Sequence, residues 1–303
     1  MKLLTRSDFD GIACAVLLKE LGLIDEMVYA HPKDLQDGKV EVTRDHILAN
    51  VPFVPGCGLW FDHHSSEYER KELEGKYEGA SRKAPSAARV VYDYYNDPRL
   101  KKFDEMMHYV DKVDSADLTE DEIMNPTGWI LLGFICDPRT GLGYHKDYRI
   151  SNLQLMKDLM EDMAGIGIDE IMAKPDVQER VKRYFENQEE AVKFLKEKSY
   201  VDGPAVITDA RGCTDMPPAN RFLIYSLFPQ TNISIRMIDG RGKQFCAISV
   251  GYSTLNRTSD VNVGKLMAKY GGGGHKAVGT CQVPYEEADR VLKEILDVIK
   301  AQG

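Results

Sequence analysis

Two short apolar segments, each running directly into a polar turn, constrain the fold of this chain more than any other feature. Residues 1–5 precede a turn that holds two aspartates, and residues 58–61 run straight into Asp62, His63 and His64. The stretch after the first turn carries apolar side chains at helical spacing. Strand, helix and strand in this order predict a parallel α/β sheet, whose functional residues gather at the carboxyl ends of the strands.

The rest of the chain changes its pattern twice. Helical periodicity dominates over residues 85–188, and the stretch 177–198 is rich in Glu and Lys, which is typical of a solvated connecting helix. Beyond it, three candidate strands alternate with three candidate helices. We therefore expect an α/β protein with an N-terminal parallel-sheet domain over residues 1–195, joined by a linker helix to a smaller α/β domain over residues 200–303.

The individual elements are expected at the following places. The strands are predicted at residues 1–5, 27–30, 58–61, 205–207, 233–237 and 245–250. After the first helix, further helices are predicted at residues 86–95, 103–113, 153–163, 177–198, 220–228, 261–270 and 285–301.

The composition excludes several classes of protein. With 43% hydrophobic and 29% charged residues, and no apolar run of about 20 residues, the chain is expected to be soluble. The six cysteines show no CxxC spacing and the first residues form no apolar signal segment, so we expect reduced thiols and a cytoplasmic location. The net charge of -9 argues against coating long nucleic acid but permits a short anionic substrate.

Asp8 and Asp10 lie two residues apart in the turn between the first strand and the first helix. Alternate side chains in such a turn can converge on one cation. The N-terminus of the following helix also favours a nearby phosphate. The alternative is that Asp10 does no more than cap this helix.

The segment Asp62-His63-His64 combines a carboxylate with two imidazoles at the end of an apolar strand. This ligand mixture suits Mn²⁺ or Fe²⁺, and in a phosphoesterase such ions activate a water and bind phosphoryl oxygens. The alternative is a loop with one satisfied buried histidine and one exposed histidine.

Asp111, Asp114 and Asp117 follow one another at intervals of three on a predicted helix. This spacing places neighbours on one face, where unpaired carboxylates are unfavourable unless a cation neutralises them. The alternative is an acidic face turned to solvent.

Four consecutive glycines, residues 271–274, are followed by His275 and Lys276. Such a run leaves backbone N–H groups free to approach an anion, with two side-chain donors beside them. The run is no Walker loop, because GxxxxGK[ST] is absent, and the alternative is a flexible turn. Arg257 upstream is a second candidate phosphate ligand, or else a lone surface arginine.

Taken together and in this order, the segments SDFDGIACAVLL, FDHHSSE and YGGGGHKAVGT resemble the DHH/DHHA1 phosphoesterase superfamily, in its branch of oligoribonucleases and exopolyphosphatase-related proteins. The resemblance covers nearly the whole chain. It implies a DHH domain that binds metal and carries catalysis, followed by a DHHA1 domain that binds substrate. It also implies one or two Mn²⁺ ions, or Mg²⁺, and by family habit a homodimer.

The resemblance assigns roles to individual residues. It gives as catalytic residues Asp62, His63 and His64. It gives as metal ligands Asp8, Asp10, Asp62, His63 and Asp114, with Asp111 as the alternative in the last position. It gives as ligands of the substrate's terminal phosphate Gly272, Gly273, Gly274 and His275, with Arg257 beside them.

Two positions depart from the family pattern. Members commonly carry a histidine two or four residues before the first aspartate, and these positions hold Arg6 and Leu4 here. Asn50 stands where members carry an aspartate after the strand that precedes the DHH strand. Both replacements would weaken a site for a second ion. Arg6 could instead hold phosphate directly, so we count Arg6 and Asn50 as candidate substrate-binding residues.

The favoured function is metal-dependent hydrolysis of phosphate esters in short oligonucleotides or small nucleotides, in a cleft between the two domains. One alternative is an exopolyphosphatase that cleaves phosphoanhydride bonds. The other is a nucleotide or phosphate sensor with a degenerate metal site and no catalysis.

Overall fold

The computed structural model describes residues 1–302, which form two compact units. Unit 1 comprises Met1–Asp117 and Pro126–Tyr184, and unit 2 comprises Leu118–Asn125 and the described residues from Phe185 onward. The division falls inside one continuous helix, α10 (Pro175–Lys198). Within residues 1–302, no helix has the length and apolar character needed to cross a bilayer.

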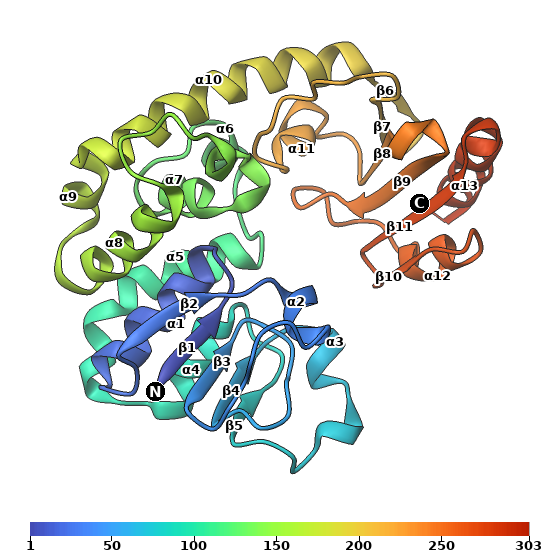
Figure 1. Cartoon of the computed structure of the whole chain (residues 1–303). Coiled ribbons are helices and arrows are strands. Elements are labelled where there is room, and N and C mark those ends of the chain that lie inside the picture. The colour runs from blue at the N-terminus through green and yellow to red at the C-terminus, as the bar shows by residue number, and fades with distance from the viewer. Residues whose placement is uncertain (303) are drawn as a thin grey trace. The chain divides into compact units, whose positions relative to one another are not determined.

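Unit 1 is built on a five-stranded sheet in the order β2-β1-β3-β4-β5, with every neighbouring pair parallel (Figure 1). This confirms the predicted parallel α/β sheet, and it brings the carboxyl ends of all five strands to one edge. The strands are β1 (Lys2–Thr5), β2 (Glu26–Tyr29), β3 (His46–Ala49), β4 (Leu59–Asp62) and β5 (Gly79–Ser81).

The helices of unit 1 surround one buried helix, α1, in which every residue from Phe9 to Leu18 is buried. It packs against α4, α5, α7 and α8, so it is apolar on all sides and has no exposed polar stripe. The helices wholly inside this unit are α1 (Phe9–Glu20), α2 (Pro32–Gln36), α3 (Ser65–Tyr68), α4 (Ala87–Tyr95), α5 (Asp104–Asp114), α7 (Gly128–Cys136), α8 (Asn152–Gly165) and α9 (Ile168–Ala173).

Unit 2 contains a six-stranded sheet in the order β10-β11-β9-β8-β7-β6. Only β7 and β8 pair in parallel, and the other neighbours are antiparallel. The strands are β6 (Ser199–Asp202), β7 (Ala205–Asp209), β8 (Ile233–Asp239), β9 (Phe245–Tyr252), β10 (Gly273–Gly274) and β11 (Val278–Pro284). The helices are α6 (Glu120–Met124), α11 (Leu223–Leu227), α12 (Val263–Ala268) and α13 (Ala288–Gln302), with the second half of α10.

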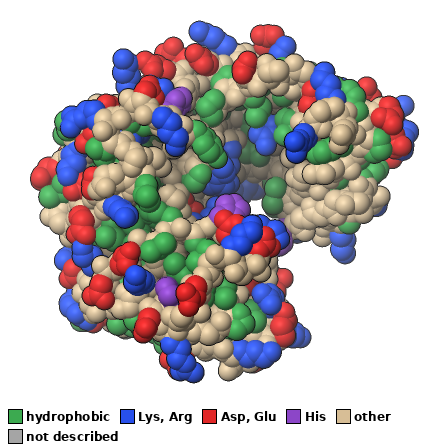
Figure 2. Space-filling view, in the orientation of Figure 1, with side chains coloured by type: hydrophobic (Ala, Val, Ile, Leu, Met, Phe, Trp, Pro, Cys, Tyr) green, Lys and Arg blue, Asp and Glu red, His purple; other side chains and the backbone are tan. Residues whose placement is uncertain are grey.

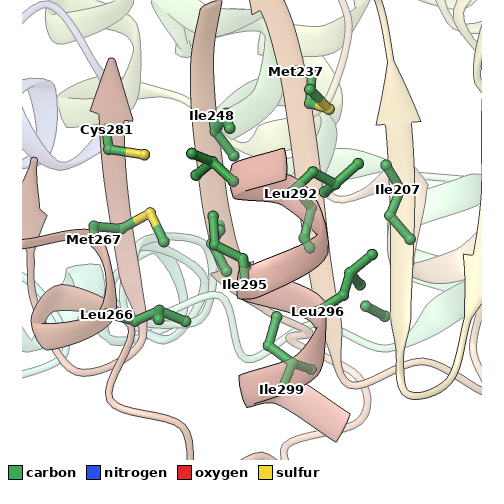
Figure 3. Packing of buried hydrophobic residues seen from close by; sticks show 14 of the residues in the cluster. Ile207, Met237, Ile248, Leu266, Met267, Cys281, Leu292, Ile295, Leu296 and Ile299 are labelled. Carbon is green, nitrogen blue, oxygen red and sulfur yellow. The ribbon is translucent and has the colours of Figure 1, made fainter. Parts of the chain in front are cut away.

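Helix α13 supplies much of the core of unit 2. Its buried side chains recur at spacings of three and four residues, which places them on one face toward the sheet. Figure 3 shows this packing, with the α13 side chains beside Ile207 of β7, Met237 of β8 and Ile248 of β9. The α13 residues labelled there are Leu292, Ile295, Leu296 and Ile299.

Candidate active site

Polar side chains of unit 1 gather at the carboxyl edge of its parallel sheet. Asp8 and Asp10 follow β1, Asn50 follows β3, and Asp62 ends β4 with His63 next to it. Because the strands are parallel, residues far apart in sequence meet at this edge. The sheet therefore explains why the separate motifs of the sequence can form one site.

Asp10, His63 and Asp114 form the centre of this site, since one ligand atom from each lies within 4.8 Å of the others. The Nε2 atom of His63 is 3.1 Å from Oδ2 of Asp114 and 3.9 Å from Oδ2 of Asp10. Two atoms that each lie about 2.1 Å from one ion, at a right angle, are about 3 Å apart. The spacing fits three ligands of one divalent cation.

The orientation of His63 supports the same conclusion. Its Nδ1 atom lies 3.2 Å from the carbonyl oxygen of Ala84, and a carbonyl only accepts, so Nδ1 carries the hydrogen. In the neutral ring the lone pair on Nε2 then faces the carboxylates, and this buried atom has no hydrogen-bond partner among the described residues. A metal-binding histidine commonly donates its other N–H to a carbonyl in this way.

Asp10 lies in α1, but the N-terminus of another helix, α4, holds its carboxylate. Its two carboxylate oxygens accept hydrogen bonds from the backbone N–H groups of Ala87 and Ala88, at 2.9 and 2.8 Å, in the first turn of α4. The alternative that Asp10 caps α1 is wrong, because that role belongs to Asp8, which accepts from Gly11 N at 2.9 Å. Burial raises the pKa of Asp10, while His63 acts to lower it.

Asp114 ends helix α5 with its carboxylate pointing toward the same centre. Burial raises its pKa well above the usual range, and the negative charges of Asp10 and Asp8 raise it further. The C-terminus of a helix also disfavours a negative charge. A cation would offset all three effects.

Asp62 contributes a second unsatisfied atom. Its side chain is buried, Oδ1 accepts from Nδ1 of His64 at 2.9 Å, and Oδ2 has no hydrogen-bond partner among residues 1–302. A buried carboxylate oxygen without a donor is costly unless a cation is nearby. Asp62 is therefore a further candidate ligand beside Asp10, His63 and Asp114, and carboxylates together with one imidazole suit Mn²⁺ or Mg²⁺.

His64 lies at the outer side of the site, with 40% of its side chain exposed. Burial acts to lower the pKa of His64, but the hydrogen bond and charge of Asp62 outweigh burial and leave this pKa above its usual value. A partly exposed imidazole that is held by a carboxylate can meet a bound substrate and carry a proton.

Asp8 differs from the other carboxylates because protein donors surround it. Its Oδ1 accepts from Gly11 N and from Nδ2 of Asn50, each at 2.9 Å, and its Oδ2 lies 3.2 Å from Nε of Arg6. Asn50 is buried and has a φ of 58°, a conformation that asparagine tolerates better than most residues. Both oxygens of Asp8 are thus engaged without a metal.

Asp111 does not join the group of three. Its Oδ2 accepts from Nε of Arg89 at 2.8 Å and lies 2.7 Å from Nη2, while Ser86 Oγ donates to Oδ1 at 2.6 Å. The expected face with aspartates at every third position is also interrupted, because α5 ends at Asp114 and Asp117 lies beyond it. Of the two alternatives, the structure brings Asp114 to the site.

The glycine run in unit 2 is a strand rather than an open loop. Gly273 and Gly274 form β10, which pairs with Thr280 and Gly279 of β11. A Cβ atom on Gly272 would lie 2.2 Å from the carbonyl oxygen of Thr280, so this glycine permits close packing of the backbone.

Part of the expected phosphate-binding chemistry is also absent from this run. The N–H groups of Gly271, Gly272 and His275 donate to the carbonyl oxygens of Ala268, Met267 and Val278, so the prediction of free N–H groups is wrong for these three. The side chain of His275 is exposed. Arg257 is exposed too, and its Nε donates to the carbonyl oxygen of Thr254 at 3.0 Å.

Several groups that shape the site escaped the sequence analysis. The carbonyl of Ala84 and the N–H groups of Ala87 and Ala88 are backbone atoms, which carry no residue signature. The serine that begins a predicted helix, Ser86, was the one available signal, and it caps α4 by accepting from Arg89 N.

A cavity of about 420 Å³ adjoins the first motif within unit 1. Ser7, the neighbour of Asp8, lines it together with Tyr29, Tyr148 and Lys146. No carboxylate lines it, although the chain as a whole has a net charge of -9. The buried guanidinium of Arg180 stacks 3.6 Å from the ring centre of Tyr148 and holds this wall in place.

Solved structures resemble the whole chain. It is 44% identical to a pGpG-specific phosphodiesterase, PggH from Vibrio cholerae, with a TM-score of 0.87 over 100% of this chain and 99% of that one. The DHH domain of a protein from a family of ribosomal proteins has a TM-score of 0.65 at 11% identity, over 99% and 86% of the two chains. An exopolyphosphatase-related protein from Bacteroides fragilis has a TM-score of 0.53 at 14% identity, over 99% and 92%.

The two more distant structures show a shared fold. No family model matches the sequence, and no curated protein matches it either.

Proposed function

Because this chain belongs to the DHH/DHHA1 superfamily of metal-dependent phosphoesterases, we propose that it hydrolyses pGpG, and short oligonucleotides like it, to mononucleotides. The observation that carries this proposal is the 44% identity, over the full length of both chains, to a pGpG-specific phosphodiesterase. In this proposal unit 1 is the DHH domain and unit 2 is the DHHA1 domain.

We propose Mn²⁺, or Mg²⁺, as the cofactor, with Asp10, Asp62, His63 and Asp114 as its ligands. The cofactor would supply a water of lowered pKa and positive charge beside the phosphoryl oxygens. The protein supplies the orientation: α4 fixes the carboxylate of Asp10, and the carbonyl of Ala84 fixes the ring of His63. These contacts hold the ligands in place before substrate arrives.

His64 is the proposed proton donor to the leaving oxygen. Its Nδ1–H bonds to Asp62, which favours the charged imidazolium and points Nε2 away from that carboxylate. Its side chain is 40% exposed, so a phosphate ester can approach it. A positioned acid of this kind contributes roughly 10²- to 10⁴-fold to the rate.

The nucleoside next to the scissile bond is proposed to bind in the cavity beside Ser7. The rings of Tyr29 and Tyr148 suit a nucleobase, and Lys146 suits a phosphate oxygen. Acidic and basic side chains are interspersed on the face drawn in Figure 2, which favours a short ligand over a long nucleic acid.

The far phosphate of the substrate is proposed to bind in unit 2. Gly273, Gly274, His275 and Arg257 are the candidate residues. The exposure of the His275 and Arg257 side chains supports this assignment.

We further propose a cytoplasmic enzyme, since all six cysteines are free thiols. We also propose that the enzyme forms a homodimer, as the family resemblance implies. The exopolyphosphatase and sensor alternatives are not favoured, because the 44% identical relative is a phosphodiesterase and the metal-binding residues of the site are present.

The test is release of GMP from pGpG in the presence of Mn²⁺, beside a five-nucleotide RNA, phosphoadenosine phosphate, cyclic di-AMP and polyphosphate. We expect turnover of pGpG that is lost in Asp62→Asn and kept in Asp169→Asn, an exposed aspartate on α9. Turnover of polyphosphate alone, or none from any substrate, would refute the proposal.

A further inference from the structure

The site for a second metal ion does not fit the residues around Asp8. We infer that this chain binds one ion per site and that the guanidinium of Arg6 replaces the second ion as the positive charge beside the substrate's phosphate. The part of this inference in which Arg6 binds the substrate's phosphate rests on the proposed function. The part that concerns a single ion does not.

Both carboxylate oxygens of Asp8 already have partners within the protein. Gly11 and Asn50 donate to one of its oxygens, and Arg6 lies against the other. In the same unit, His63 Nε2 and Asp62 Oδ2 are buried without any hydrogen-bond partner within residues 1–302. Both oxygens of Asp10 also accept hydrogen bonds, but from neutral backbone N–H groups, whereas Asp8 has a positively charged guanidinium against it, so a cation is needed less at Asp8 than at Asp10.

The positive charge of Arg6 opposes the binding of a cation at Asp8. A further cation at Asp8 would be repelled by the guanidinium 3.2 Å from its carboxylate.

Arg6 has terminal nitrogens that can donate hydrogen bonds to a ligand. The contact to Asp8 lies at Nε, and within the described chain the terminal nitrogens of Arg6 donate no hydrogen bond. About a third of the side chain, 34%, is exposed. A guanidinium fixed at Nε presents its terminal N–H groups in a planar fork, which matches two oxygens of a phosphate. Asp8 and Asn50 are then positioning residues for Arg6.

The metal content tests the first half of the inference. Full-length protein loaded with Mn²⁺ and freed of excess is expected to hold one ion per chain and to give the electron paramagnetic resonance spectrum of isolated Mn²⁺. The double variant Arg6→His with Asn50→Asp is expected to hold two ions and to show spin coupling between them. Two coupled ions in the wild type, or one ion in a folded double variant, would overturn it.

Binding of GMP tests the second half. In wild type loaded with Mn²⁺, isothermal titration gives the Kd of GMP, and we expect Arg6→Ala to raise it about 10-fold or more without loss of the ion. Arg6→Lys should recover part of the affinity, and the exposed Arg99→Ala should leave it unchanged. An unchanged Kd in Arg6→Ala overturns this role, and if that variant fails to fold, an unchanged Kd in Arg6→Lys does so.

Failure of the proposed function would look different. A wild type with one ion but no activity on pGpG would refute the substrate and leave the single-ion site standing. An enzyme active on pGpG with two coupled ions would refute the single-ion site alone.

Discussion

The Nε2 atom of His63 lies 3.1 Å from Oδ2 of Asp114, yet the two atoms form no hydrogen bond. Both instead face a space that is also reached by a carboxylate oxygen of Asp10. The two carboxylates repel one another in the absence of a cation and make this part of unit 1 less stable than its packing alone would allow. We therefore expect its stability to depend on metal.

Asp114→Asn is expected to stabilise the metal-free protein and to abolish its stabilisation by Mn²⁺. The substitution removes a half-buried carboxyl group whose pKa is raised by burial and by the negative charges of Asp10 and Asp8. If this relieves about 1 kcal/mol, the Tm of the metal-free protein rises by roughly 2 °C in a chain of this size. Differential scanning calorimetry with EDTA and with Mn²⁺ measures both effects.

Asp111→Asn is the matched control, because it lies one helical turn away and pairs with Arg89. Loss of the Asp111 carboxylate should lower the Tm measured in EDTA. The increase in Tm that Mn²⁺ causes should persist. If Asp111→Asn removed that increase and Asp114→Asn kept it, the assignment of the two aspartates would have to be reversed.

His64→Gln is expected to lower kcat on pGpG by roughly 10²- to 10⁴-fold with the metal content unchanged. The glutamine can still donate a hydrogen bond to Asp62, but it cannot deliver a proton. Steady-state kinetics and metal analysis on the same preparation separate catalysis from metal binding. A variant that loses its metal together with its activity would make His64 a ligand instead.

Strands β3 and β5 of the parallel sheet were missed. Its other strands could be predicted from sequence because they are short apolar runs that end in polar turns. Helix α7 could not, although all its residues from Trp129 to Cys136 are buried, because a helix that is apolar on every side has no periodicity. Strand β11 was missed as well. So were the edge strand β6 and the two-residue strand β10, since pairing partners rather than local propensity define them.

The candidate metal ligands were predicted better than their contacts. Asp10 and His63 were expected together, since residues at the carboxyl ends of parallel strands converge, and Asp114, which ends helix α5, was expected with them from the family resemblance. The choice of Asp114 over Asp111 depends on Arg89, and the engagement of Asp8 depends on Arg6 and Asn50. Such partners are set by tertiary packing and could not be derived from spacing alone.

The glycine run offers a matched pair of substitutions. Gly272→Ala is expected to destabilise unit 2 by roughly 1–3 kcal/mol, because its Cβ would lie 2.2 Å from the carbonyl oxygen of Thr280. Gly273→Ala should leave stability nearly unchanged, because a Cβ there meets no atom within 4 Å. Urea unfolding of both variants measures the difference, and equal losses would contradict the packing role of Gly272.

Lys146→Ala is expected to raise the KM for pGpG about 10-fold with little change in kcat. Lys146 lines the cavity beside Ser7, has no ion pair among residues 1–302, and can supply a charge-assisted hydrogen bond worth about 1.5 kcal/mol to a phosphate oxygen. The KM for bis(p-nitrophenyl) phosphate, which has no nucleoside, should stay the same because nothing in that substrate needs the cavity. Lys76→Ala, an exposed lysine outside the cavity, is the control. An equal rise in KM for both substrates would mean that Lys146 acts through the general charge of the unit, and the nucleoside would then have to bind elsewhere.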